Sequence, residues 1–384
     1  MKTLIRNVRL YPDEESCYEN GNILLSDGKV IGLNVETFDD DTKVIDGKGM
    51  NLLPGYIDVH VHGGYGLDFL EQPEKCPEVF SFNTVKEGCT AYLASFVCGN
   101  RQKLVNAMKC YRKLDFKGAK CLGVHMEGPF ISPDYKAVMD PKTIRLPDKD
   151  EFLELIDASD NNIRQMTIAP EMPGALEIIE YGATHGINMM MGHSGATTEE
   201  ALKGIEKGAF GLTHMYNAMS QHEHRNPGLV TAGMLNEQLI CEMICDGFHV
   251  HPDVVTATIK KMKDQIALVT DASLMRGLPD GDYIFSSYEV HKNGIKAQVK
   301  ETGRFAGSVV GMDDVVRNVV KFTGCSLNDI VKMASVNPAK IAGCADHKGR
   351  LLPGYDADII LLDDDLNVRS TFVEGEYWYN YEVN

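Results

Sequence analysis

The chain has 384 residues, of which 43% are hydrophobic and 24% charged, a composition typical of a globular protein with room for one large domain and a smaller one. Its 38 Lys and Arg residues against 55 Asp and Glu residues give a formal net charge of −17, and a field of that sign disfavours nucleic acids and anionic membranes as partners. No apolar run reaches the roughly 18 residues that a membrane span needs.

Both ends of the chain are rich in short β-strand patterns. Runs such as GNILLSDGKVIGL and ADIILLDDDLNVRSTFVEGEYWYN alternate apolar and polar residues between turn signals, and Ser26–Lys29 predicts a hairpin turn. We therefore expect residues 1–52 and 353–384 to form one small β-sandwich domain.

The middle of the chain, residues 53–352, alternates strand patterns with helical ones such as LVNAMKCYRKL and EEALKGIEKG. Eight strands are expected, at residues 57–60, 89–96, 120–126, 164–169, 187–191, 209–214, 238–245 and 266–270. This alternation predicts an α/β fold, a (β/α)8 TIM barrel. Residues 312–344 predict two further helices, with Asn337-Pro338 capping the second part. Residues 282–306 predict strands that join the β domain or lie over the barrel mouth.

The ten cysteines show no paired spacing, and the first residues, MKTLIRN, lack the apolar run and cleavage site of a signal peptide. We therefore expect reduced, mostly buried cysteines and a cytoplasmic protein. Cys241 and Cys245 lie in the run LICEMICDGFHV, which favours a buried strand over half of a zinc site.

Residues that bind metals or move protons stand at the ends of five of the expected strands, and these residues are His60, His62, Glu127, His193, His214 and Asp271. Alternate residues of an extended chain point the same way, so one metal can take both His60 and His62. Parallel barrels assemble their catalytic groups at the carboxyl ends of the strands. The shared placement therefore favours one common site over separate core or surface residues.

The chemistry follows from this set of ligands. Nitrogen and oxygen donors with one open position suit a divalent cation such as Zn, Fe, Mn or Co. Such a cation lowers the pKa of a bound water and polarises a carbonyl group. Asp271 can accept the proton of that water and pass it to the leaving group, so we expect hydrolysis of a C–N or C–O acyl bond. His125 is a candidate neighbour of the ligands and is given no role.

The order of eight motifs resembles the N-acetylglucosamine-6-phosphate deacetylases of the amidohydrolase superfamily: PGYIDVHVHGG, GVHMEGPF, GHSGA, GLTHMYNAM, CDGFHV, LVTDA, RFAGS and NPAKIAG. The resemblance runs from about Leu53 to Asp358. It implies an enzyme that hydrolyses a linear amide, releasing acetate and the amino-sugar phosphate. It also implies Glu127, His193 and His214 as the principal metal ligands and Asp271 as the catalytic acid and base. Members with the HxH pair bind two cations and others one, so one or two are expected here.

The same resemblance implies how the substrate binds. Asn217 and Ala218 line the sugar site, and Arg225 and His249 hold the phosphate, with Arg225 reaching across the interface of a homodimer. A planar cationic fork and a second donor would supply the positive charge that a protein of net charge −17 needs for an anionic ligand.

One position departs from the family pattern. Where these deacetylases usually carry a histidine that contacts the substrate, the segment after HMEGPFISP has Met139. A methionine packs against a sugar face but cannot donate a hydrogen bond. Loss of one donor changes selectivity by about ten- to a hundredfold, so N-acetylgalactosamine 6-phosphate or another N-acylated sugar stays open as the substrate.

Two other interpretations stay open at this stage. Cyclic amidases of the same superfamily share the HxH pair and the barrel, but they bridge their metals with a modified lysine after the fourth strand, where this chain has Ala169-Pro170-Glu171. A non-catalytic barrel that binds a sugar phosphate is the second alternative. It would be expected to lose a metal ligand or the proton-transfer acid, and this chain keeps both.

Overall fold

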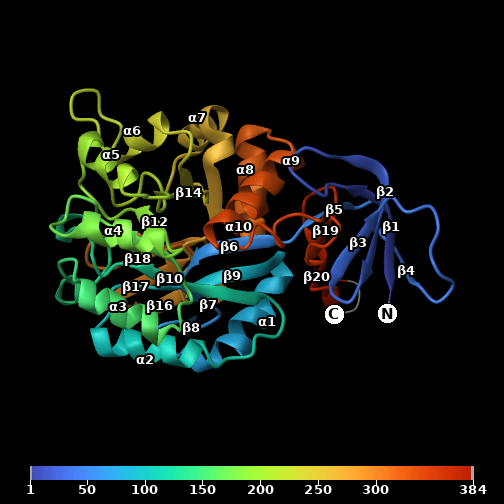
Figure 1. Ribbon diagram of the computed structural model, residues 1–384, viewed down its shortest axis with the longest axis horizontal. Coiled ribbons are helices and arrows are strands. Elements are labelled where there is room, and N and C mark those ends of the chain that lie inside the picture. The colour runs from blue at the N-terminus through green and yellow to red at the C-terminus, as the bar shows by residue number, and fades with distance from the viewer. Residues whose placement is uncertain (1, 382–384) are drawn as a thin grey trace.

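The computed structural model describes residues 2–381 and contains a barrel domain with a small β domain beside it (Figure 1). The middle of the chain builds the barrel, while the first and last strands, with both termini, belong to the small domain. The expected (β/α)8 barrel with a β domain formed by both chain ends is confirmed. Within residues 2–381, no helix has both the length and the apolar character needed to cross a bilayer.

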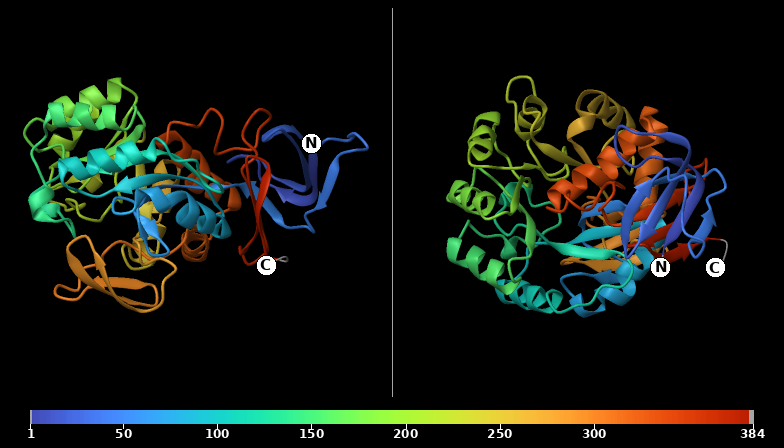
Figure 2. Two further views of the ribbon diagram at one scale, coloured as in Figure 1. Left: turned by 90° about the horizontal axis from the view of Figure 1, so that it is seen from below. Right: turned by 45° about the vertical axis from the view of Figure 1, so that its right-hand side comes forward.

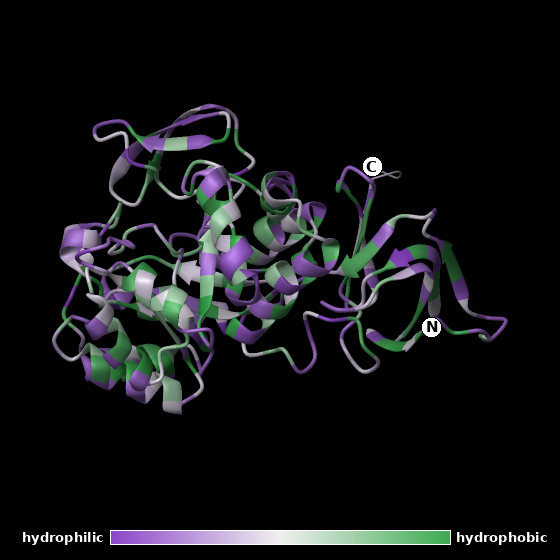
Figure 3. Ribbon diagram, turned by 90° about the horizontal axis from the view of Figure 1, so that it is seen from above, coloured by the Kyte–Doolittle hydropathy of each residue, from purple (hydrophilic) through white to green (hydrophobic). Residues whose placement is uncertain are grey.

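The small domain is one eight-stranded sheet made of β1 (Thr3–Leu10), β2 (Tyr18–Ser26), β3 (Lys29–Leu33), β4 (Lys43–Asp46), β5 (Asn51–Pro54), β19 (Ile359–Leu362), β20 (Val368–Val373) and β21 (Glu376–Asn380). The order is β21-β20-β19-β5-β1-β2-β3, with β4 paired to β1. The sheet curls back on itself, because Val30 N of β3 donates to Tyr355 O just before β19. In Figure 3 hydrophobic residues gather along these strands.

The hairpin expected at Ser26–Lys29 joins β2 to β3. Its turn residues Asp27 and Gly28 have φ angles of 52° and 76°, the left-handed conformation that a two-residue hairpin turn requires. Strand β5 runs across the boundary expected after residue 52, and the limits of the two domains stay a prediction.

Eight parallel strands form the barrel: β6 (Tyr56–Val61), β9 (Cys89–Phe96), β10 (Lys120–Glu127), β11 (Ile163–Ile168), β12 (Asn188–Met191), β13 (Gly211–Leu212), β14 (Ile240–Ile244) and β15 (Ile266–Val269). Each lies where the sequence predicts a strand, although β13 is shorter than expected. Cys241 and Cys245 are buried in and just after β14, in agreement with the strand interpretation.

The seam between the first and last barrel strands is closed by a side chain as well as by the backbone. No ladder joins β6 to β15 among the described residues. Asp58 of β6 instead accepts hydrogen bonds from Thr270 Oγ1 at 2.6 Å and from Thr270 N at 3.2 Å. The amide of Asp271 donates to the carbonyl of His60 at 2.8 Å. These bonds bring the ends of the two strands together.

Helices surround the barrel (Figure 2). They are α1 (Phe82–Thr84), α2 (Arg101–Tyr111), α3 (Lys149–Ala158), α4 (Ala175–Thr184), α5 (Thr198–Glu206), α6 (Leu229–Leu235), α7 (Pro252–Met262), α8 (Met312–Thr323), α9 (Leu327–Val331) and α10 (Asn337–Ile341). Helix α5 shows why they start where they do, since Thr197 and Glu200 form a capping box at its first turn.

The two helices expected over residues 312–344 are present, but the second one is composite. A π-helical turn, Lys332–Val336, connects α9 to α10, so Asn337 begins α10 inside a continuous helical segment and caps no end. Its side chain instead donates to the carbonyl of Ile266 at 2.8 Å. Ala339 and Ile341 then pack against barrel residues such as Ile57, which places α10 below the strands as the barrel floor.

Residues 281–299 form a separate three-stranded antiparallel sheet of β16 (Gly281–Phe285), β17 (Tyr288–Asn293) and β18 (Lys296–Val299). The sheet stands off the barrel on the side away from the small domain (Figure 2, left). Its inner face packs on Val97 and Val138, which follow β9 and β10. Of the two positions that the sequence allowed, this segment takes the barrel mouth.

Candidate active site

Six residues predicted as ligands or proton carriers meet at the carboxyl ends of the barrel strands. His60 lies in β6 and His62 follows it directly, while Glu127 is the last residue of β10. The other three follow β12, β13 and β15 within two residues, and they are His193, His214 and Asp271. The structure therefore brings together side chains that span 212 residues of sequence, from 60 to 271, counting both ends.

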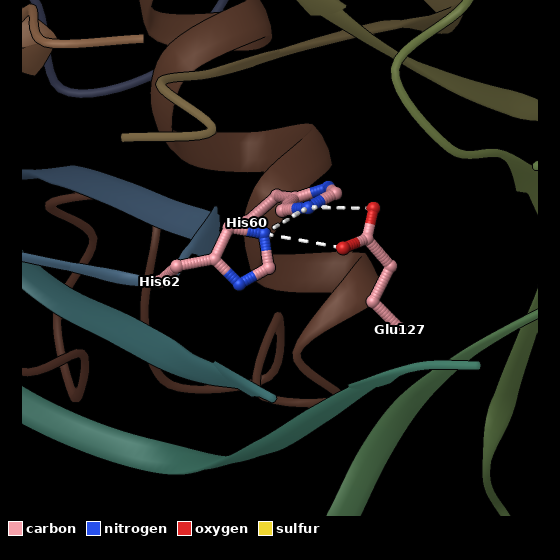
Figure 4. A group of neighbouring side chains, drawn as sticks. All are labelled: His60, His62 and Glu127. Atoms are coloured by element: carbon pink, nitrogen blue, oxygen red, sulfur yellow. Dashed lines mark hydrogen bonds and ion pairs between the residues drawn. The ribbon is translucent and has the colours of Figure 1, made fainter. Parts of the chain in front are cut away.

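Glu127 is the centre of this arrangement. Its Oε1 lies 3.0 Å from His193 Nε2, 3.0 Å from His214 Nε2 and 3.4 Å from His60 Nε2. Its Oε2 lies 3.2 Å from His62 Nε2. Figure 4 shows the imidazoles of His60 and His62 turned toward this carboxylate. All four histidines and Glu127 are nearly inaccessible to solvent.

Asp271 stands beside this group. Its Oδ1 lies 3.2 Å from His62 Nε2 and 3.7 Å from His60 Nε2. The loop that carries it is joined to the loop that carries His62, because His62 N donates to the carbonyl of Ala272 at 2.8 Å. Asp271 therefore keeps a fixed position relative to the HxH pair.

Hydrogen bonds on the far side of the rings hold three of the four imidazoles in place, while His214 Nδ1 is buried without such a partner among the described residues. His60 Nδ1 lies 2.9 Å from Glu242 Oε2, His62 Nδ1 lies 3.2 Å from the carbonyl of Ser95, and His193 Nδ1 lies 2.7 Å from the carbonyl of Tyr135. A carbonyl acceptor requires a proton on Nδ1, so Nε2 is left with a lone pair that faces Glu127. These partners fix the ring orientation that metal binding needs.

His125 belongs to the surroundings of the site and does not reach Glu127. Its Nδ1 lies 2.9 Å from Ser95 Oγ and its Nε2 lies 2.8 Å from Thr167 Oγ1. Its ring packs edge-on against His60, with 4.5 Å between centroids. Burial and the neighbouring His60 hold the pKa of His125 well below its usual value, so it is a neutral packing partner of the ligands.

Three of the six residues adopt a left-handed backbone. The φ angles of His193, His214 and Asp271 are 47°, 30° and 48°. Non-glycine residues rarely adopt this conformation, and it costs about 1–3 kcal/mol at each position. Such conformations are concentrated at functional sites, where the surrounding structure enforces them. Here they turn side chains that follow a strand back over the barrel end.

Both carboxylates of the site are ionised at neutral pH. Burial opposes the ionisation of Glu127, but His60 and His193 outweigh it and hold its pKa well below the usual range. Burial likewise raises the pKa of Asp271, while His60 and His62 lower it by more. An ionised Asp271 next to the ligands can accept a proton.

The donors fit a divalent cation. Two groups of three residues, His60 with His62 and Glu127, and Glu127 with His193 and His214, each have ligand atoms within 4.8 Å of one another. In each group two Nε2 atoms face each other, at 3.3 Å for His60 and His62 and 3.1 Å for His193 and His214. Two facing nitrogens share at most one proton, whereas a cation attracts both lone pairs. Glu127 belongs to both groups.

A cavity of about 300 Å³ opens over these residues. Of the predicted substrate-binding residues, Met139, Asn217, Ala218 and His249 line it. Arg225 does not, because it lies on an exposed loop whose backbone is bonded to the carboxylate of Glu223. The rest of the wall comes from the loops and the three-stranded sheet: Val97, Ala137, Val138, Phe285, Ser286, Arg304, Phe305 and Gly307.

His249 is prepared to donate into this cavity. Its Nδ1 lies 2.6 Å from Asp246 Oδ2, and its ring packs on Phe305 with 5.0 Å between centroids. Burial lowers the pKa of His249, but the bond to Asp246 outweighs burial and raises it above the ordinary value. With Nδ1 bonded to Asp246, Nε2 donates into the cavity when the ring is protonated, and the raised pKa favours that form.

Known proteins place the chain in a family. Residues 51–377 match the model of the amidohydrolase family. The chain belongs to the amidohydrolase family. Among its relatives are the N-acetylglucosamine-6-phosphate deacetylase of Bacillus subtilis (strain 168), 33% identical over 97% of this chain and 96% of the relative, and the N-acetylgalactosamine-6-phosphate deacetylase of Escherichia coli O157:H7, 32% identical over 97% and 99%.

A solved structure of a deacetylase is similar to this amidohydrolase in fold as well as in sequence. The mutant N-acetyl-D-glucosamine-6-phosphate deacetylase of Mycobacterium smegmatis, in complex with N-acetyl-D-glucosamine-6-phosphate, superposes with a TM-score of 0.92 at 27% identity. The superposition covers 99% of this chain and 100% of that one. The resemblance to N-acetylglucosamine-6-phosphate deacetylases that the motifs indicate is confirmed.

Sequence reasoning missed three residues of this amidohydrolase site. Glu242 is fully buried, and its carboxylate contacts His60 Nδ1. Asp58 accepts a hydrogen bond from Thr270 and so joins the ends of β6 and β15. Both are acids inside apolar strands, LICEMIC and YIDVH, and a buried acid in a strand is the signal that could have found them. Arg304 lines the cavity, and only its presence in the RFAGS motif marked it.

Proposed function

We propose that this amidohydrolase removes the acetyl group of N-acetylglucosamine 6-phosphate, giving glucosamine 6-phosphate and acetate in amino-sugar catabolism. The observation that carries the proposal is the ionised carboxylate of Asp271, 3.2 Å from His62 Nε2 and at the edge of two donor groups that share Glu127. The names of relatives that align over nearly the whole chain support the choice of substrate.

The chain's own residues account for the proton transfers. A divalent cation held by His60, His62 and Glu127, or by Glu127, His193 and His214, would supply Lewis acidity toward the acetamide carbonyl and would lower the pKa of water. Asp271 accepts the proton of the attacking water as the new C–O bond forms. It then returns that proton to the sugar nitrogen as the C–N bond breaks, so the amine leaves neutral together with acetic acid. The second proton of the water, now on acetic acid, passes to the amine or to solvent at neutral pH and gives acetate.

We further propose two cations per subunit, of the kind that imidazole and carboxylate donors prefer: Zn, Fe, Mn or Co. Support comes from the two three-residue donor groups, which share Glu127 and otherwise use different histidines. Elemental analysis tests the number. Substituting His62→Gln should lower the content from two ions to one, and a content of one ion in the unsubstituted protein would contradict the proposal.

For the substrate, we propose that Asn217 and Ala218 contact the sugar and that His249 contacts the phosphate, since all three line the cavity. Arg225 lies outside it on an exposed loop, so it would reach a phosphate only from a second copy of the chain. We also propose that the protein is a homodimer and that it is cytoplasmic. Size-exclusion chromatography with light scattering would test the first.

An acetate-release assay tests the function. The metal-loaded protein is expected to release acetate from N-acetylglucosamine 6-phosphate. Substituting Asp271→Asn should lower the rate by about 10²- to 10⁴-fold while the metal content stays the same. No acetate from any phosphorylated N-acetylhexosamine would show that the proposed function is wrong.

A second candidate substrate is N-acetylgalactosamine 6-phosphate. Met139 lines the cavity and is almost fully buried with Cys98 and Ile131, so it offers an apolar wall where a hydrogen-bond donor was expected. The relative from Escherichia coli O157:H7 carries the galactosamine name at nearly the same identity as the Bacillus protein. Assaying both epimers side by side separates the two.

The cyclic-amidase and non-catalytic alternatives are less favoured by the geometry. Glu171, the acid after the fourth strand, accepts hydrogen bonds from Ser194 Oγ and Gly195 N, both at 2.7 Å. It anchors the loop of His193 and belongs to neither donor group. A non-catalytic barrel would have no need of Asp271 beside a complete set of ligands.

A further inference from the structure

Arg304 is the only Lys or Arg among the described residues that line the cavity. The other charged groups of the wall are the carboxylates of Glu127 and Asp271 and the histidines. In a protein of net charge −17, an anionic substrate that enters this cavity meets repulsion from the protein as a whole. One cation at the wall therefore has a large influence on which ligands bind.

The side chain of Arg304 has no partner within residues 2–381. It is exposed and forms no hydrogen bond, ion pair or cation–π contact there. Other arginines near acids are engaged, as Arg145 is with Glu151 and Arg317 with Asp313. The guanidinium of Arg304 thus keeps its five N–H donors available for a ligand.

The backbone that carries Arg304 is held on both sides. On one side, Val299 N donates to the carbonyl of Arg304 at 2.8 Å, which attaches it to β18 of the three-stranded sheet. On the other, Ser308 N donates to the carbonyl of Asp271 at 2.8 Å, four residues further along. Gly307 has a φ of 64° and passes so close that an added Cβ would lie 2.8 Å from the same carbonyl. The segment 304–308 is therefore tied to the strand end that carries Asp271.

We infer that Arg304 recognises the phosphate of the substrate from within the same chain and is a specificity-determining residue. This inference rests on the proposed function. In an N-acetylhexosamine 6-phosphate the acetamide and the phosphate lie on opposite sides of the sugar ring. With the acetamide at Glu127 and Asp271, the phosphate points away from both carboxylates, toward the cation of the wall. A guanidinium binds a phosphate through two parallel hydrogen bonds.

Two neighbours complete the phosphate site. The residue after Arg304, Phe305, packs on the ring of His249 with 5.0 Å between centroids. The Nδ1 proton of His249 is bonded to Asp246, so Nε2 donates to a ligand when the ring is protonated. Arg304 and His249 both line the cavity, and Phe305 connects them because it follows Arg304 directly and contacts the ring of His249.

The experiment compares Arg304→Ala with Arg304→Lys and with Arg112→Ala. Arg112 is exposed at the end of α2 and forms no side-chain contact that the structure records within residues 2–381, so its removal changes the net charge equally without touching the cavity. The measured quantity is the ratio of kcat/KM for N-acetylglucosamine 6-phosphate over N-acetylglucosamine. The affinity for glucose 6-phosphate, which has the phosphate but no acetamide, is measured by calorimetry on the metal-loaded protein.

Arg304→Ala should lower the ratio and weaken the binding of glucose 6-phosphate by about ten- to a hundredfold, because a charged hydrogen-bond pair is lost. For Arg304→Lys, the ratio and the affinity should lie between those of the unsubstituted protein and of Arg304→Ala, because lysine keeps the charge but lacks the planar guanidinium. Arg112→Ala should leave both values unchanged. The inference is overturned if Arg304→Ala keeps the ratio and the affinity, or if Arg112→Ala lowers them equally.

The inference and the proposed function fail in different ways. If the unsubstituted protein releases no acetate from any sugar, the proposed function is wrong, and the affinity for glucose 6-phosphate still tests Arg304. If acetate is released but Arg304→Ala does not change the ratio, the function stands and only the inference fails.

Discussion

The two ends of the cavity are built differently. At the proposed metal end, every predicted ligand comes from the end of a barrel strand and is buried, and His60, His62 and His193 are each held by a further partner, such as Glu242 for His60 and Ser95 for His62. At the mouth, Phe285 and Arg304 come from the three-stranded sheet and the segment after it, and Arg304 is exposed. The first region resembles a protein core made of polar groups, and the second combines buried apolar side chains such as Phe285 with the exposed cation of Arg304.

This difference separates chemistry from selectivity. The side chains of the metal end contact one another and their partners, so the loss of one partner should shift the positions of all the predicted ligands. The mouth contributes contacts one at a time, so its substitutions should change which substrate is used more than the rate of the bond cleavage. Four predictions test the contrast, in order of decreasing effect.

The largest effect is expected for Glu127→Gln. Glu127 belongs to both donor groups, so its substitution leaves neither group complete. Metal content should fall below one ion per chain, and kcat/KM should drop by about 10³-fold or more because the Lewis acid is lost. Elemental analysis and the acetate assay measure the two quantities. Retention of two ions at full occupancy would contradict the central role of this carboxylate.

Glu242→Gln should act through His60. The carboxylate lies 2.9 Å from His60 Nδ1 and also accepts a hydrogen bond from Gln165 Nε2. Removing its charge should weaken metal binding by about 10- to 100-fold, as for other partners of metal-bound histidines. Metal content is followed against increasing chelator. Glu177→Gln, on the exposed face of α4, is the control. Equal metal affinity in the two variants would contradict a role of Glu242 in metal binding.

Met139→His tests the mouth. The family that the motifs resemble usually carries a histidine here, and a new donor in the wall should favour the glucosamine epimer over the galactosamine epimer by about tenfold. Met139→Leu keeps the apolar wall that Met139 forms with Cys98 and Ile131, and should leave the ratio of the two epimers unchanged. A ratio that responds to leucine as much as to histidine would point to packing instead.

His249→Gln should produce the smallest effect, a change in pH dependence. Asp246 raises the pKa of His249 above 6.5 despite burial, so below that raised pKa the ring is a cation and favours a phosphate. The preference for phosphorylated over neutral sugar should therefore fall as pH rises through the raised pKa. In His249→Gln the preference should be lower at acid pH and nearly independent of pH. A wild-type profile that is flat between about pH 6 and 9 would refute this role.

Much of this molecule follows from its sequence. The eight barrel strands appear where apolar runs predict them, because parallel strands buried on both faces leave a continuous apolar signal. The positions of His60, Glu127, His193, His214 and Asp271 at strand ends follow from the same runs, since each strand fixes where its loop begins. Local pattern is sufficient for features that depend on neighbours in sequence.

Features that depend on distant neighbours were decided by the tertiary structure. Closure of the barrel brings Glu242 to His60 across 182 residues and Asp58 to Thr270 across 212, and no local pattern encodes these pairs. The same holds for the choice between two arginines. Sequence marks Arg225 through its family motif, but packing of the three-stranded sheet over the barrel mouth puts Arg304 at the cavity. The sequence by itself determines the strands and the ligands at their ends, and barrel closure alone decides which charges face them.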